Sequence, residues 1–138
     1  MLFSHDTKVE SLGRAPLFSD LSKDELAQLA KATEDLEVEA GRVLCREGEL
    51  AQEFFVIIEG EAQVTKGDQQ LGTLGDGDFF GEIALIVDIP RTATVTATSP
   101  VRLLVVTDRA FRGLIEEMPS IATKVLQVLG ERLHADAV

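Results

Sequence analysis

The feature that most constrains this chain is a series of short apolar segments, separated by glycines, between Leu36 and Thr107. The segments are rich in β-branched and aromatic residues and span 36–38, 43–45, 54–58, 62–65, 71–74, 93–97 and 101–106. The intervening glycines are Gly41, Gly48, Gly60, Gly67, Gly75 and Gly77. Short strands at close spacing with glycine turns are typical of a β-sandwich or barrel. Gly67 and Asp68 predict the tip of one hairpin.

Helical periodicity flanks this β-rich region on both sides. Ser22 followed by Glu25 has the pattern of a capping box and predicts a helix over about 22–33. Asp108 and Pro119 begin two further apolar-periodic stretches, which predict helices over about 108–118 and 119–134. Residues 1–12 show little pattern, so we expect them to fray.

We therefore expect an α+β fold: a jelly-roll-like antiparallel β-barrel over about 36–107, with one N-terminal helix and two C-terminal helices. At 138 residues the chain has the length of a single domain, 1–138. A hydrophobic content of 45% argues for a packed globule rather than a disordered chain.

Charge and cysteine content limit the partners and the compartment. The net charge is −11, and Lys and Arg are scattered rather than clustered, so we expect no direct binding to nucleic acid. The longest apolar runs, 54–58 and 83–87, are far too short to span a bilayer. The single cysteine, Cys45, cannot form an internal disulfide, and a reducing, cytoplasmic setting is the simplest interpretation.

Residues that could perform chemistry are few. The two histidines, His5 and His134, lie near the two ends of the chain, far from the predicted barrel. Metal catalysis and nucleophilic triads both need such side chains inside the fold. The glycine-rich run 75–81 fits neither a dinucleotide fingerprint nor an EF-hand loop. We expect no catalytic residue, no metal and no resident cofactor.

The most informative segment for binding runs from Gly77 to Ala97. Gly81 precedes a predicted helical turn at 82–86, whose unpaired backbone amides could attract a phosphate. Arg91 follows at the start of a strand, and its planar guanidinium can pair with two oxygens of one phosphate. Glu82 is unfavourable beside an anion unless it accepts hydrogen bonds, which ribose hydroxyls would donate. A phosphate beside a sugar hydroxyl describes a nucleotide, although Arg91 and Glu82 alone could equally be a surface ion pair.

Two stretches carry a family resemblance. The residues FGEIAL at 80–85 and RTATVTA at 91–97 resemble the phosphate-binding cassette of the cyclic-nucleotide-binding domain family, which here spans 80–93. The likeness covers Leu17 to Leu133, and the family's order of helix, barrel, helix, helix matches the periodicity. The resemblance implies that Arg91 binds the cyclic phosphate, helped by the backbone amides of Ile83 and Ala84. It also implies that Glu82 and the backbone of Gly81 hold the ribose 2′-hydroxyl.

The resemblance assigns further residues to the base. Val64 and Leu74 would pack against it from the barrel wall, although apolar residues in strands are core residues by default. Thr92 would face the base or the phosphate, Ala93 completes the cassette, and Arg132 sits where some members place a basic capping residue. Strand alternation puts Arg91 and Thr92 on opposite faces, so the chain must bend if both reach the ligand.

The predicted function is that of a regulatory sensor. The chain would bind a cyclic nucleotide monophosphate, cAMP in preference to cGMP, with the last helix moving as a lid. Ala122 and Leu126 extend the apolar surface of that helix, which leaves open a homodimer or an effector contact there. Two alternatives remain: an interaction module that kept the fold and lost the ligand, and a cupin-type enzyme. The chain is either a stand-alone module or part of a larger protein.

Overall fold

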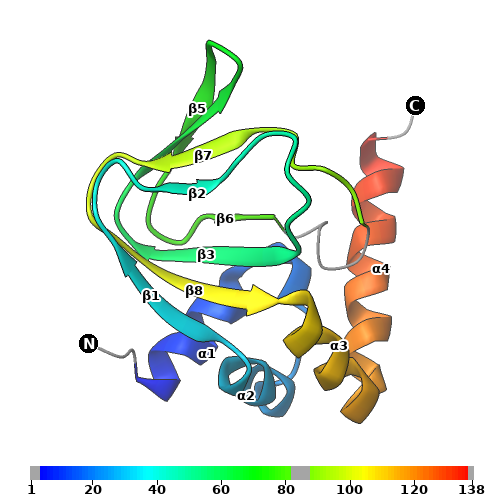
Figure 1. Ribbon diagram of the computed structural model, residues 1–138. Coiled ribbons are helices and arrows are strands. Elements are labelled where there is room, and N and C mark those ends of the chain that lie inside the picture. The colour runs from blue at the N-terminus through cyan, green and yellow to red at the C-terminus, as the bar shows by residue number, and fades with distance from the viewer. Residues whose placement is uncertain (1–3, 82–87, 137–138) are drawn as a thin grey trace. The chain divides into compact units, whose positions relative to one another are not determined.

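The structure, a computed structural model, describes residues 4–81 and 88–136, apart from the side chains of 129 and 132–136. It divides into two compact units, which are described separately. A β unit spans Thr33–Asp108, and a helical unit combines the chain up to Ala32 with the chain from Arg109 onward. Figure 1 shows the strands and helices of the two units.

The β unit contains two four-stranded antiparallel sheets (Figure 1). One has the strand order β1-β8-β3-β6 and the other β2-β7-β4-β5. The strands are β1 (Glu34–Val38), β2 (Val43–Cys45), β3 (Glu53–Glu59), β4 (Ala62–Lys66), β5 (Gln69–Leu74), β6 (Phe79–Phe80), β7 (Thr94–Ala97) and β8 (Val101–Thr107). The predicted α+β class with antiparallel sheets is confirmed, and the two sheets remain separate rather than closing into one barrel.

The predicted segments correspond closely to these strands. All seven lie within or overlap a strand of the structure, and the hairpin turn at Gly67 and Asp68 joins β4 to β5, where Lys66 pairs with Gln69. The short strand β6 was not predicted, because two phenylalanines in a glycine-rich stretch carry no alternation. The predicted helical turn at 82–86 lies outside the described residues.

The core of the β unit lies between its two sheets. Its buried members are Val38, Phe55, Ile57, Ala62, Val95, Ala97, Val101, Leu103 and Val105. The neighbouring residues Phe54 and Val56 on β3 are buried as well. A strand buried on both faces shows a continuous apolar run instead of alternation, which is the pattern at 54–58. Phe55 stacks on Phe80 with ring centroids 4.7 Å apart, and this contact fixes β6 against β3.

The turn between β3 and β4 requires glycine at position 60. Gly60 has φ +120°, and a Cβ there would lie 2.5 Å from the carbonyl oxygen of Pro100. No other residue tolerates both the backbone conformation and the close approach. This turn therefore holds the β3–β4 connection tightly against the start of β8.

The described part of the helical unit contains one more α-helix than predicted. Its elements are α1 (His5–Arg14), the 3₁₀ turn η1 (Pro16–Phe18), α2 (Lys23–Lys31), α3 (Asp108–Glu117) and α4 (Pro119–Asp136). Helix α1 occupies residues expected to fray. It begins at Ser4, whose hydroxyl accepts from the amide of Thr7, and it buries Leu12. A short cap and one buried leucine give too weak a sequence pattern to predict the helix.

The predicted capping box of α2 is confirmed, and one of its members has a second role. The Glu25 carboxylate accepts from the Ser22 amide at 2.8 Å, from Lys124 Nζ at 2.5 Å and from the Ser120 hydroxyl. The glutamate is only 4% exposed. Burial acts to raise the pKa of Glu25, but hydrogen bonds from Lys124, Ser120 and Ser22 outweigh it and lower the pKa to about 2. This cluster ties α2 to the start of α4.

Candidate phosphate site around Arg91

Arg91 is a buried cation within the β unit. It lies just before β7 and is 8% exposed. Its Nη2 donates to the carbonyl oxygen of Glu53 at 2.8 Å, and its Nε is buried without a hydrogen-bond partner among the described residues. Within those residues no carboxylate forms an ion pair with the guanidinium. A buried charge with incomplete pairing is costly, and a bound anion would relieve that cost.

Gly81 lies directly against this guanidinium. It has φ +83°, and a Cβ built on it would lie 2.5 Å from Arg91 Nη1 and 2.5 Å from the Glu53 carbonyl oxygen. The structure thus brings together the two cassette residues, Gly81 and Arg91, that are ten positions apart in the chain. The backbone at position 81 can approach the guanidinium only because no side chain stands between them.

Three predicted ligand residues lie outside the described part of the chain. They are Glu82, Ile83 and Ala84, which directly follow Gly81. Arg132 belongs to α4 in the helical unit, and its side chain is likewise outside the description. The described portion of the predicted site is therefore Gly81, Arg91, Thr92, Ala93, Val64 and Leu74.

Thr92 and Ala93 differ in their surroundings. Thr92 is exposed although its neighbour Arg91 is buried, and the chain bends at 92–93 before β7 begins. Ala93 is half-buried, and its carbonyl oxygen accepts a weak hydrogen bond from Cys45 Sγ at 3.5 Å. Burial raises the pKa of the Cys45 thiol, and the nearby Arg91 charge only partly offsets this. Cys45 is thus held as a neutral, poorly nucleophilic thiol next to the cassette.

Val64 and Leu74 lie on neighbouring strands of one hairpin. Val64 pairs with Gly72 and Ala62 pairs with Leu74, so the two side chains are diagonal neighbours on the same face of the β4–β5 pair. Both are partly buried and pack against the core between the sheets. Phe80 and Cys45 pack against the same core.

Sequence reasoning missed the backbone groups that hold Arg91. The Arg91 amide donates to the Glu49 carbonyl at 2.9 Å, and the Arg91 carbonyl accepts from the Gly48 amide at 2.8 Å. Together with the Glu53 carbonyl, these groups surround the arginine with main-chain atoms. Main-chain contacts leave no side-chain signature, so no motif could have identified them.

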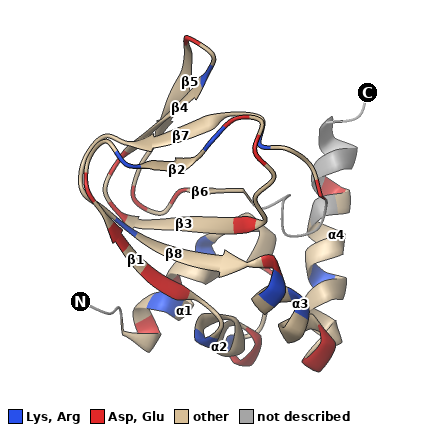
Figure 2. Cartoon of the chain, viewed as in Figure 1, with Lys and Arg blue, Asp and Glu red and all other residues tan. Residues whose placement is uncertain are grey.

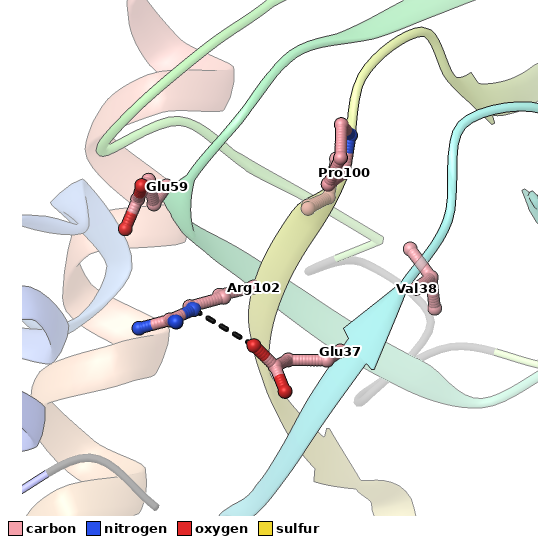
Figure 3. A pocket seen from close by; sticks show the side chains of 6 residues that line it. Glu37, Val38, Glu59, Pro100 and Arg102 are labelled. Carbon is pink, nitrogen blue, oxygen red and sulfur yellow. Dashed lines mark ion pairs between the residues drawn. The ribbon is translucent and has the colours of Figure 1, made fainter. Parts of the chain in front are cut away.

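A hollow of about 180 Å³ opens at another part of the β unit (Figure 3). Its lining residues are Glu37, Val38, Glu59, Pro100, Val101 and Arg102. Arg102 Nε pairs with Glu37 at 2.9 Å, so this arginine already has a carboxylate partner. None of the predicted ligand residues lines this hollow. It therefore differs from the Arg91 site in both its residues and its charge pairing.

Charged residues of both signs are distributed over the described strands and helices (Figure 2). Across the described ranges, no three His, Cys, Asp or Glu side chains come together as metal ligands would. Among the helices of the described chain, none has the length and apolar character to cross a membrane.

Comparison with known protein families identifies a match over most of the β unit. Residues 35–118 match the family model described as "Cyclic nucleotide-binding domain". A putative potassium channel protein of Rhodopseudomonas palustris is 39% identical over 124 residues, covering 88% of this chain and 30% of the relative. The chain spans about a third or less of the length of the curated relatives it matches.

Solved structures agree with this match. The N-terminal domain of a transcriptional regulator from Streptomyces coelicolor superposes with a TM-score of 0.86 at 27% identity, covering 91% of this chain and 92% of that one. The regulatory domain of a Toxoplasma gondii kinase (PKA), solved with cAMP, superposes with a TM-score of 0.75 at 29% identity, covering 80% of this chain and 44% of that one.

Proposed function

Because this chain belongs to the cyclic nucleotide-binding domain family, we propose that it binds a cyclic nucleotide monophosphate around Arg91 and acts as a regulatory sensor without chemistry of its own. The observation that carries the proposal is the Arg91 guanidinium. It is buried, bound to a carbonyl, and unpaired at Nε among the described residues. The single negative charge of a cyclic phosphate would pair with it, and the planar fork could contact two phosphate oxygens.

The family resemblance supplies the proposed roles of the remaining site residues. The backbone amides of Ile83 and Ala84 would assist Arg91 at the phosphate. Glu82 and the backbone of Gly81 would accept and position the ribose 2′-hydroxyl. A hydrogen bond from the ribose hydroxyl to the Glu82 carboxylate would offset the repulsion between this carboxylate and the phosphate.

The base would lie against the apolar side of the site, on Val64 and Leu74. We propose cAMP rather than cGMP as the ligand. Val64 and Leu74 offer the guanine 2-amino group no hydrogen bond, and the Thr92 hydroxyl is exposed while Arg91 is buried. The related Toxoplasma domain was itself solved with cAMP.

Ligand binding would be transmitted through α4. The helix would move as a lid, and Arg132 would add a basic capping group. Such a movement is a shift of population, limited by the difference in ligand affinity between the two lid positions. The output would reach an effector protein, a second copy through the exposed Leu126, or another part of a longer chain in the cytoplasm.

A thermal-shift experiment tests the proposed binding. The melting temperature is measured with cAMP, cGMP and noncyclic 5′-AMP, each over a range of concentrations. A ligand that binds only the folded state stabilises it by about 2.7 kcal/mol at 100 times Kd. We expect both cyclic nucleotides to raise the melting temperature and 5′-AMP to do far less, because its extra charge and free phosphate misfit the site.

Two outcomes would contradict the proposal. Equal shifts from 5′-AMP and cAMP would mean that the cyclic phosphate is not recognised. No shift from any nucleotide would identify an interaction module that kept the fold and lost the ligand. Titration calorimetry of cAMP with the unmodified chain gives the affinity on which the variants below are compared.

A further inference from the structure

The loop that follows β2 runs alongside the Arg91 segment and is bonded to it at consecutive residues. The Glu47 amide donates to Thr94 Oγ1 at 3.0 Å. The Gly48 amide donates to the Arg91 carbonyl at 2.8 Å, and the Glu49 carbonyl accepts from the Arg91 amide at 2.9 Å. We call residues 47–49 the clasp. It holds the main chain of Arg91 on both its donor and its acceptor side.

Glu47 also connects the clasp to the turn between β4 and β5. Its carboxylate Oε1 accepts from the Gly67 amide at 3.0 Å, at the turn between β4 and β5. Gly67 has φ +58°, and this turn joins Lys66 to Gln69. Glu47 thus receives a bond from the hairpin turn through its side chain and donates one to Thr94 through its backbone.

The two elements joined by Glu47 carry the two halves of the proposed site. Val64 and Leu74 lie on the β4–β5 hairpin, and Arg91 lies beside the clasp. Without the Glu47 carboxylate, no described hydrogen bond of the clasp reaches the β4–β5 hairpin. Among the described residues, the hairpin would then be linked to the Arg91 segment through core packing and the β4–β7 ladder, which pairs Ala62–Thr65 with Thr94–Ala97.

We propose that Glu47 is a positioning residue that fixes the Arg91 segment relative to the β4–β5 hairpin and thereby sets the affinity for the cyclic nucleotide. The inference rests on the proposed function, because it names the residue that holds the phosphate side and the base side of that same site in register. Glu47 is exposed and acts through Arg91 and the hairpin rather than on the ligand. Preorganisation of this kind lowers the cost of ordering the site when the ligand binds.

The first test compares Glu47→Ala with Glu47→Gln by calorimetry with cAMP. Loss of one charge-assisted hydrogen bond at an exposed site predicts a Kd about tenfold higher for Glu47→Ala. The glutamine keeps a carbonyl oxygen that can accept from Gly67, so Glu47→Gln should bind within about threefold of the unmodified chain. Glu61→Ala, at an exposed glutamate of the β3–β4 turn, is the matched control and should leave Kd unchanged.

A double-mutant cycle asks whether Glu47 acts through Arg91. Arg91→Lys keeps a positive charge but loses the planar fork, so it should retain weak, measurable binding. In that background Glu47→Ala should raise Kd much less than it does in the unmodified chain, since residues that act on one site couple. Equal effects of Glu47→Ala in both backgrounds would overturn the positioning role.

Amide hydrogen exchange without ligand separates this inference from the proposed function. Glu47→Ala should speed exchange of the Arg91 and Gly48 amides about tenfold and leave the Ile57 amide, bonded to the Asp78 carbonyl, unchanged. Unchanged exchange at Arg91, or unchanged Kd in Glu47→Ala, would overturn the inference. An unmodified chain that binds no cyclic nucleotide would overturn the proposed function and the affinity role with it, even if exchange at Arg91 responds.

Discussion

The two units of the molecule each bury a charge, and they treat it differently. In the helical unit, the Glu25 carboxylate has three kinds of donor: a backbone amide, a hydroxyl and an ammonium. In the β unit, the Arg91 guanidinium donates to one carbonyl, and its Nε has no partner among the described residues. The buried carboxylate has its hydrogen bonds within the protein, whereas the described residues leave the buried guanidinium incompletely paired.

If the proposed function holds, this difference separates a charge that stabilises the fold from one that binds the ligand. A fully paired buried ion connects elements, and removing one partner leaves an uncompensated charge. An incompletely paired buried ion carries a desolvation cost that an external partner can remove. Glu25 accordingly joins α2 to α4, while Arg91 is the group that a cyclic phosphate would complete. The predictions below are designed to break or sharpen this contrast.

The largest effect is expected from Arg91→Ala. Affinity for cAMP should fall by about 2–5 kcal/mol, as for truncation of one member of a buried charge pair. Stability without ligand should change little, because the variant loses one hydrogen bond but also one incompletely satisfied charge. Calorimetry and urea unfolding measure the two quantities. A variant that binds cAMP as tightly as the unmodified chain would contradict the assignment of Arg91 to the phosphate.

Gly81→Ala should displace the Arg91 guanidinium, because it adds a side chain where the backbone of Gly81 contacts that group. The new Cβ meets Arg91 Nη1 and the Glu53 carbonyl, so strain and displacement should together destabilise the fold by about 3 kcal/mol and weaken binding. Gly77→Ala is the matched control, since Gly77 has φ +85° but nothing within 4 Å of its would-be Cβ. The control should lose only about 1 kcal/mol of stability. Equal losses in unfolding experiments would show that the close approach at Gly81 is unimportant.

The contribution of Glu25 to the free energy of unfolding should depend on pH. Its pKa of about 2 in the folded chain lies below the usual 4.5, so the ionised carboxylate stabilises the fold above pH 4.5. That contribution, about 3 kcal/mol at neutral pH, should disappear as the pH falls from 4.5 to 2. The difference in unfolding free energy between the unmodified chain and Glu25→Gln should therefore shrink over that range. A difference independent of pH would mean that the carboxylate's charge is not what ties α2 to α4.

The smallest effect is expected at Thr92, the exposed neighbour of Arg91. Thr92→Ala should change affinity for cAMP and for cGMP by no more than about 1 kcal/mol each, the size of one neutral hydrogen bond. Competition calorimetry with both nucleotides gives the ratio of affinities. If the unmodified chain prefers cGMP tenfold or more and Thr92→Ala loses that preference, the hydroxyl reads the base and cAMP is the wrong ligand.

Local patterns predicted most of the fold. The capping box at Ser22 and Glu25, the hairpin turn at Gly67 and the apolar segments all depend on residues near one another in the chain, and the structure confirms them. Helix α1 and strand β6 escaped prediction. Helix α1 has a weak apolar pattern, and β6 is defined by its pairing with β3 rather than by its own two residues.

The sequence by itself determined the family, the order of helices and strands, and the pairing of Gly81 with Arg91 as one motif. These depend on residue types at short, regular spacing, which a linear pattern can carry. Only the tertiary structure decided that Arg91 is buried against the Glu53 carbonyl, 38 residues away, and that Glu25 meets Ser120, 95 residues away. Contacts between distant segments depend on how the sheets and helices pack, and a carbonyl or amide can come from any residue type. A linear sequence therefore shows which charges the chain contains, while packing decides which of them are buried and which groups they contact.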